Sequence, residues 1–205
     1  MASLLDIIMA MFIGSVLLLS VFNANFLIYQ HSTVLNGDVL VQELLISNAQ
    51  IVEGEFRNMG VGVAEDQATI LQALDTAITF LSDIDRNGTP DTIRYWAGNP
   101  SALSQTQNSM DRFLHRKVNN GSVQSVGIVT QFLLRYFSQN QLDTLIAPVT
   151  GTDLKMIKIV EITLEVQNPY ALYRDPRDIK MGEREALYSS SYWRQTRLAS
   201  QNFNR

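Results

Sequence analysis

The sequence predicts an α+β fold, in which one long N-terminal helix packs on a mainly antiparallel β-rich head. Two observations indicate it. Residues 7–37 contain no Asp, Glu, Lys or Arg, and apolar residues then recur near helical spacing as far as Phe56. The rest of the 205-residue chain has short stretches of β-branched and aromatic residues between turn residues. We therefore divide the chain into an apolar helix half for membrane or filament core (1–28), an amphipathic helix half (29–59) and a globular head (60–205).

The first helix half combines a membrane-length apolar run with one acid. The run from Ile7 to Phe22, with its milder flank to Ile28, is long enough to cross or nearly cross a bilayer, for which about 20 apolar residues are needed. Asp6 directly precedes it, and a carboxylate costs about 2.5 to 3.5 kcal/mol at the centre of a membrane and less near its surface. We therefore expect Asp6 to pair with an N-terminal amine, its own or a neighbour's.

The helix is expected to continue to about Asn58 and to end where Gly60 can adopt the left-handed cap conformation. Unbroken, it would be about 85 Å long. An irregular stretch is expected between Gly14 and Asn25, because glycine weakens a helix and the Ser and Asn side chains there compete for backbone groups. The Asn-Gly-Asp segment 36–38 is a second expected weak point.

Six segments of the head have the composition of strands, namely 77–81, 92–96, 112–118, 126–137, 154–166 and 192–199. The Asn-Asn-Gly segment 119–121 predicts a hairpin turn, because Asn and Gly adopt positive φ at low cost. Alternation in the fifth segment predicts a solvated face that carries Lys158, Glu161, Thr163 and Glu165. The polar segment 168–191 is expected to be a surface excursion.

One loop has the spacing of a calcium site. Asp83, Asp85 and Asn87 alternate and are followed by Gly88, with Asp91 further on. Calcium prefers oxygen ligands of this kind around a sharp glycine turn, so these four oxygen-bearing residues are candidate ligands. The twelfth position of the loop is Arg94 where a calcium loop carries a bidentate Glu. The alternative is an Asx-type turn without metal.

Composition and motifs argue against several other functions. The net charge of −4 and the pI near 5.1 argue against a general nucleic-acid binder. The absence of cysteine excludes disulfides and thiolate chemistry within the chain. His31 and His115 have no neighbouring nucleophile or metal motif, and no P-loop or dinucleotide fingerprint occurs. We therefore expect a protein that is not an enzyme and whose candidate cofactor is calcium.

The N-terminal residues place a small residue, two aliphatic residues and an acid before a long apolar helix, in the order Ala2-Ser-Leu-Leu-Asp-Ile-Ile-Met-Ala-Met-Phe-Ile-Gly14. With the helix exit Glu55-Phe-Arg-Asn-Met-Gly60, this order resembles the type IV pilins and type II secretion pseudopilins, especially the larger minor pilins and J-type pseudopilins. The resemblance implies that Asp6 replaces the family's helix-embedded glutamate and pairs with the N-terminal amine of an adjacent subunit during assembly. Two features differ from the family: the acid is Asp rather than Glu, and no basic leader ending in Gly precedes it.

The resemblance also implies a set of assembly residues and a function. The assembly residues are Ala2, Asp6 and Gly14, with either Ala2 or Met1 as the first mature residue. The chain would be a structural subunit of an extracellular type IV pilus-like filament, held in the inner membrane before assembly. Its partners would be further copies of itself or other pilin-like subunits, together with inner-membrane assembly machinery. Two alternatives remain: a minor pilin or pseudopilin that primes or tips a filament, and a monomeric membrane-anchored calcium-binding domain.

Overall fold

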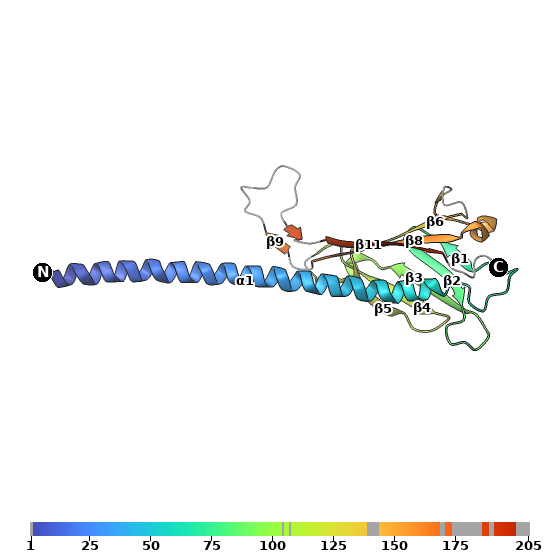
Figure 1. Ribbon diagram of the computed structural model, residues 1–205, viewed down its shortest axis with the longest axis horizontal. Helices are drawn as coiled ribbons and strands as arrows, with labels where there is room; N and C mark the ends of the chain where they lie inside the picture. Colours follow the sequence, from blue (N-terminus) through green and yellow to red (C-terminus); the bar gives the residue numbers. More distant parts are fainter. Residues whose placement is uncertain are drawn as a thin grey trace.

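The computed structural model describes residues 2–103, 105–106, 108–138, 144–168, 171–173, 186–188 and 191–199. It consists of one helix and a head of antiparallel strands, which confirms the predicted α+β class (Figure 1). The helix α1 (Ala2–Arg57) has 56 residues, which correspond to about 84 Å. Its first part projects far beyond the head (Figure 1).

The helix α1 is continuous through both segments that were expected to be irregular. The expectation of a break between Gly14 and Asn25 is therefore wrong for the isolated chain. The hydroxyl of Ser15 donates to the carbonyl of Met11 at 2.7 Å, and other hydroxyls along α1 do the same one turn back. These side chains thus bond along the helix and do not take backbone groups out of it.

The helix ends as predicted. Gly60 has φ 81°, which is the left-handed conformation of a helix cap, and its N–H donates to the carbonyl of Leu81 at 2.8 Å. The chain then passes Gly62, which also has positive φ, and the Val61 carbonyl accepts a hydrogen bond from Asp83 N at 2.8 Å. The helix exit is therefore fixed against the loop that was predicted to bind calcium.

The first sheet contains five antiparallel strands in sequence order, β1 (Ile70–Ala73), β2 (Ala77–Ser82), β3 (Asp91–Ala97), β4 (Arg112–Val118) and β5 (Gln124–Val129). The β4–β5 hairpin confirms the predicted turn, in which Asn119 has φ 49°. The short 3-10 helix η1 (Pro100–Leu103) lies in the β3–β4 connection and contacts β4.

The second sheet has the order β11-β8-β6-β7, from β6 (Gln131–Phe137), β7 (Thr144–Leu145), β8 (Ile159–Gln167) and β11 (Ser191–Ala199). A separate hairpin is formed by β9 (Ala171–Tyr173) and β10 (Ala186–Tyr188). Most of the predicted surface excursion, namely 169–170, 174–185 and 189–190, lies outside the described residues.

Two predicted strands are corrected by the second sheet. The segment 126–137 is not one strand, because the chain leaves the first sheet at Thr130 and enters the second. There the N–H and the hydroxyl of Thr130 both donate to the carbonyl of Glu165, at 2.8 and 3.1 Å. The segment 154–166 begins as the 3-10 helix η2 (Gly151–Met156) before it becomes β8.

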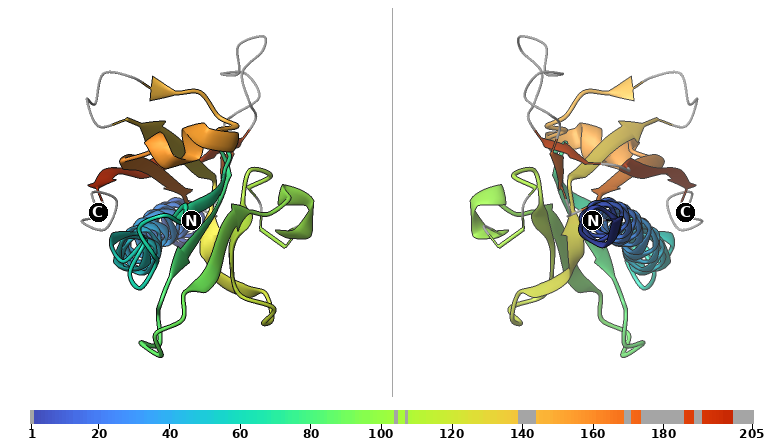
Figure 2. Two further views of the ribbon diagram at one scale, coloured as in Figure 1. Left: turned by 90° about the vertical axis from the view of Figure 1, so that its right-hand side faces the viewer. Right: turned by 90° about the vertical axis from the view of Figure 1, so that its left-hand side faces the viewer.

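The core lies between α1 and the two sheets. Figure 2, which looks along α1, shows the helix beside both sheets, and α1 contacts β11, β8 and β5. Val41, Val52 and Phe56 are fully buried, and the Phe56 ring meets the rings of Phe80 and Tyr95 edge to face at 5.2 and 5.4 Å. The helix from residue 41 onward is thus part of the core of the head.

Charged hydrogen bonds also join α1 to both sheets. Arg116 on β4 donates from Nη2 to Glu55 Oε1 at 2.5 Å, and the Tyr95 hydroxyl donates to Glu55 Oε2 at 2.6 Å. Burial, and then the Glu55 carboxylate, raise the pKa of Tyr95 well above its usual range. Arg194 on β11 donates from Nε to Glu53 Oε1 at 2.7 Å. The carboxylates of Glu53 and Glu55 are partly shielded from water, which strengthens these charged hydrogen bonds. The bonds therefore hold the helix in a fixed orientation against the head.

The prediction that Glu161 lies on a solvated face is wrong. Glu161 is 1% exposed, although Arg135 and Arg197 on either side of it are exposed. The two arginines stand directly opposite Glu161 on the neighbouring strands. Arg197 Nε donates to Glu161 Oε2 at 2.6 Å, and Arg135 Nη1 lies 3.7 Å from Oε1. These long arginine side chains shield the carboxylate from water, since an arginine stem can cover a surface while its charged end stays solvated.

Candidate functional site

The predicted assembly residues lie on the projecting part of α1. Every side chain from Ser3 to Ser32 is exposed, including Asp6. The first cation along the chain is Arg57, about 77 Å further along the helix. Within the part of the chain that the structure describes, Asp6 forms no ion pair. The head therefore cannot neutralise Asp6 of its own chain, and a partner for it must come from an N-terminus or another molecule.

Gly14 has no packing role in the single chain. A Cβ added there would meet nothing within 4 Å. The helix is continuous through this position. If Gly14 is required, the requirement must come from a neighbouring molecule that approaches the helix.

An apolar stripe continues from the projecting helix onto the flank of the head, which sequence reasoning missed. Ile28, Leu35, Val39 and Ile46 are 67%, 58%, 58% and 50% exposed, respectively. At 100° per residue these four positions lie within about 40° of one another. The buried residues of α1, such as Val52, occupy another side. We call Leu35, Val39 and Ile46 the flank stripe. The periodicity was visible in the sequence, but only the structure shows which side of the helix the head covers.

The loop between β2 and β3 brings three of its four predicted ligands together. One carboxylate oxygen each from Asp83, Asp85 and Asp91 lies within 4.8 Å of the others. Gly88 has φ 85°, as a sharp turn requires. Arg94 lies on β3 and not in this cluster, so the loop lacks the bidentate glutamate of a calcium loop.

The fourth predicted ligand, Asn87, is turned differently. Its side-chain oxygen accepts hydrogen bonds from Thr89, and its amide donates to Asp85 Oδ2 at 2.9 Å. Asp83 accepts from the backbone N–H groups of Asn87 and Gly88, at 3.1 and 2.9 Å. These are the hydrogen bonds of an Asx-type turn. The carboxylates still have unused lone pairs, so the same loop can hold a cation if Asn87 rotates.

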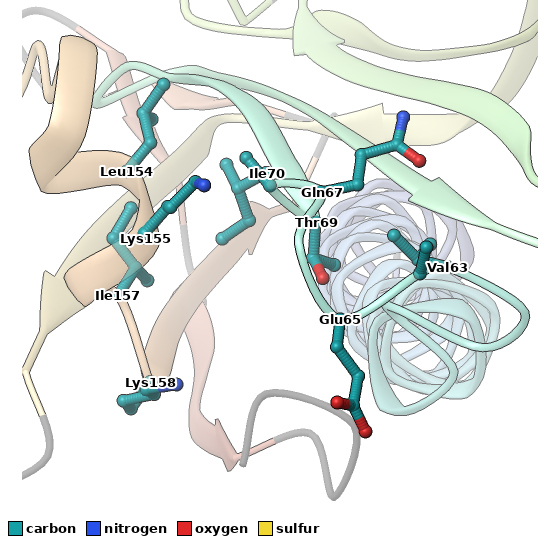
Figure 3. A pocket seen from close by; sticks show the side chains of 11 residues that line it. Val63, Glu65, Gln67, Thr69, Ile70, Leu154, Lys155, Ile157 and Lys158 are labelled. Atoms are coloured by element: carbon teal, nitrogen blue, oxygen red, sulfur yellow. The ribbon is translucent and has the colours of Figure 1, made fainter. Parts of the chain in front are cut away.

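Among the pockets in the described part of the head are two of about 190 Å³ each. One lies between the helix exit and η2, with Glu65 on one wall and Lys155 and Lys158 on the other (Figure 3). Lys155 Nζ donates to the carbonyl of Asp66 across it at 3.0 Å. The second pocket lies beside the Asp83 loop. Neither pocket is lined by a histidine, and the two histidines lie on different elements, α1 and β4.

Comparison with models of protein families, with curated proteins and with solved structures finds no match for this chain. The class of protein is therefore defined by the architecture alone. It has a long N-terminal apolar helix packed on antiparallel sheets, a loosely pilin-like arrangement. The part of α1 that projects from the head is long and apolar enough to cross a membrane.

Proposed function

We propose that the chain is a structural subunit of an extracellular type IV pilus-like filament. In this proposal α1 holds the subunit in the inner membrane before assembly and then packs against α1 of other copies in the filament core. The head stays outside. The observation that carries the proposal is the flank stripe, which extends the exposed apolar surface beyond the length that a membrane can cover.

The helix α1 carries exposed apolar residues over more than the thickness of a bilayer. About 20 helical residues cross the hydrocarbon core of a bilayer. Residues 7–28 supply that length, so Leu35, Val39 and Ile46 would lie in water if the chain were a single anchored domain. Each buried aliphatic side chain contributes about 1.5 to 3 kcal/mol. A bundle of α1 helices covers the projecting residues and the flank stripe together, which favours a filament over the monomeric anchored domain.

Asp6 supports the same proposal. Its carboxylate has no cation within reach on its own head, whereas a neighbouring subunit in a staggered bundle offers an N-terminal amine. Inside an apolar bundle such a pair forms at low dielectric, where the attraction between the charges is strong. Assembly would then depend on the acid in a way that membrane anchoring does not.

A minor pilin or pseudopilin that primes or tips a filament remains the second candidate. The same helix and the same stripe serve it, because it must enter the same bundle. It differs in needing other pilin-like subunits to form a fibre. Inner-membrane assembly machinery is a proposed partner in both cases.

We also propose calcium as a ligand of the Asp83 loop. The support is the convergence of Asp83, Asp85 and Asp91 within 4.8 Å. Binding would join the β2–β3 loop to the helix exit, because Asp83 packs against Gly62. The role of the ion would be to stabilise the head, with no chemistry of its own.

The filament proposal is tested by a charge in the flank stripe. Val39→Lys should leave folding and membrane insertion intact, because Val39 is exposed in the single chain, but it should abolish fibre formation. Gln195→Lys, on the exposed outer face of β11, is the matched control and should assemble normally. Fibre yield is measured by electron microscopy, and folding by thermal unfolding. Normal fibres from Val39→Lys would contradict the proposal.

A further inference from the structure

The outer face of the first sheet is the surface of β3 and β4 that points away from α1. Ile93 and Tyr95 point inward, where Tyr95 meets Phe56 of the helix. Because side chains alternate along a strand, the residues between them point outward. The outward positions of the two strands hold Thr92, Arg94, Trp96, Phe113, His115 and Lys117. We call this set the basic face; Figure 2 shows the sheet that carries it beside the helix.

The charges of the basic face are all of one sign. Arg94 on β3 and Lys117 on β4 stand directly opposite each other in the antiparallel register. Like charges in such a pair destabilise a sheet. The basic face has no Asp or Glu, although the whole chain has 20 acidic and 16 basic residues. Among the described residues neither cation forms an ion pair. An anion bound between them would offset the repulsion.

Aromatic rings lie beside these cations. The Arg94 guanidinium lies over the Trp96 ring, 5.1 Å from its centroid. The Trp96 ring is 5.2 Å from that of His115, which is in turn 6.0 Å from Phe113. This cation–π contact with Trp96 restrains the guanidinium, so its N–H groups are held near one position before a ligand arrives.

We propose that the basic face binds single-stranded nucleic acid without sequence specificity. Arg94 and Lys117 contact phosphates, and a base stacks on the guanidinium plane of Arg94. A nucleic acid fits better than an acidic polysaccharide, because a sugar stacks on an open aromatic ring and the Trp96 ring is already covered by Arg94. The site does not depend on the filament proposal, since it lies within one head.

The test is titration of a fluorescently labelled oligothymidylate with the full chain in nonionic detergent, followed by anisotropy at several salt concentrations. Arg94→Gln and Lys117→Gln should each weaken binding about tenfold. In the double variant the slope of log affinity against log salt should be less steep by about 1.4, because each lost phosphate contact on a single strand removes about 0.7. The matched control is Arg57→Gln, which removes an exposed cation at the end of α1. It should bind within about twofold of the native chain. Equal losses in the control and the two face variants, or unchanged binding by the face variants, would overturn the proposal.

Two further measurements separate stacking from charge. The chain has two tryptophans, so Trp193→Phe leaves Trp96 as the fluorophore, and the oligonucleotide should quench it. Arg94→Lys keeps the charge but loses the guanidinium plane, so it should retain the salt dependence and bind more weakly. Native affinity of Arg94→Lys would overturn base stacking on Arg94. Unfolding of each variant is followed separately, so that a misfolded chain is not scored as a binding defect.

Competition decides between polyanions. Polygalacturonate carries carboxylates without bases, so it should displace the oligonucleotide only at much higher charge concentration. Displacement at equal charge concentration would mean that the face recognises acidic polysaccharide or charge alone, and the nucleic-acid proposal would be wrong.

Discussion

The side chain of Asn168 packs directly on the backbone of Gly37. Asn168 directly follows β8 and is fully buried, and its Nδ2 donates to Asp38 Oδ1 at 3.1 Å. A Cβ added to Gly37 would lie 2.5 Å from Asn168 Oδ1 and 2.7 Å from its Cγ. This contact lies near the point where the helix meets the head, and helix residues before it project away.

Two glycines of α1 should therefore respond to alanine in opposite ways. Gly37→Ala forces Asn168 to move and should destabilise the head by about 1 to 3 kcal/mol. Gly54→Ala meets nothing within 4 Å and should stabilise it by about 0.5 to 1 kcal/mol, because alanine is the better helix former. Urea unfolding of the full chain in detergent measures both. A stabilising effect of Gly37→Ala would show that Asn168 adapts without cost.

Asp111 should make the head less stable as the pH rises. It is 2% exposed, and burial raises the pKa of its carboxyl, while a hydrogen bond with Thr106 opposes this. Because the pKa is raised in the folded state, the stabilising contribution of Asp111 is complete below the ordinary aspartate pKa of about 3.9. It is lost as the pH rises through the raised pKa.

Asp111→Asn should thus be more stable than the native chain at pH 7, and the difference should shrink towards pH 3.5. Denaturant unfolding at a series of pH values measures this difference. The outcome that contradicts it is an asparagine variant that is less stable at pH 7.

Calcium should raise the melting temperature of the full chain if the Asp83 loop binds it. A single site contributes about 2.7 kcal/mol at a hundredfold excess over Kd. Asp85→Ala should erase the effect, whereas Asp153→Ala, an exposed acid on η2, should retain it. Magnesium should substitute poorly, because it demands a tighter octahedral shell. An unchanged melting temperature with chelator would mean that the loop is only a turn.

The full chain is required for that experiment. A head that begins after Asn58 would lack Val41, Val52 and Phe56, which are fully buried in its core. The sequence could not indicate this, because the amphipathic pattern of residues 29–59 shows that one side is apolar but not what covers it.

Much of the fold followed from local patterns. The helix Ala2–Arg57, its cap at Gly60 and the hairpin at Asn119 depend on periodicity and on residues that tolerate positive φ, which are local properties. The predictions were wrong where contacts between segments far apart in the sequence determine the structure. Thr130 changes sheet because it bonds to Glu165, and Gly37 is a site of close packing and not a turn. Neither relationship is visible in a window of neighbouring residues.

In the candidate sites, too, local features could be predicted from the sequence and contacts between distant segments could not. The loop spacing predicted that Asp83, Asp85, Asn87 and Asp91 converge, and the structure brings the three carboxylates together while the Asn87 side-chain oxygen bonds to Thr89. Glu161 was assigned to solvent by alternation, and the arginines that cover it come from two other strands. The basic face was hidden by the net charge of −4, since composition averages over all faces. That Arg94 lies directly opposite Lys117 follows only from the register of β3 and β4, which the sequence does not show.

Removal of the acid should separate membrane insertion from assembly. Asp6→Ala should give a stable membrane protein that forms no fibres, because the amine of its neighbour then loses its partner in an apolar core. Asp6→Glu keeps the charge and should be tolerated. Membrane fractionation and fibre yield together measure the two steps. Native fibre yield from the alanine variant would refute the pairing.

Electron cryomicroscopy of the native chain after detergent removal tests the filament assignment most directly. We expect long fibres of this one protein, with residues 3–46 of α1 in the interior and the heads outside. In such fibres Leu35, Val39 and Ile46 contact α1 of neighbouring copies. Single chains in lipid, with the flank stripe exposed to water and no fibres at any concentration, would contradict the filament proposal.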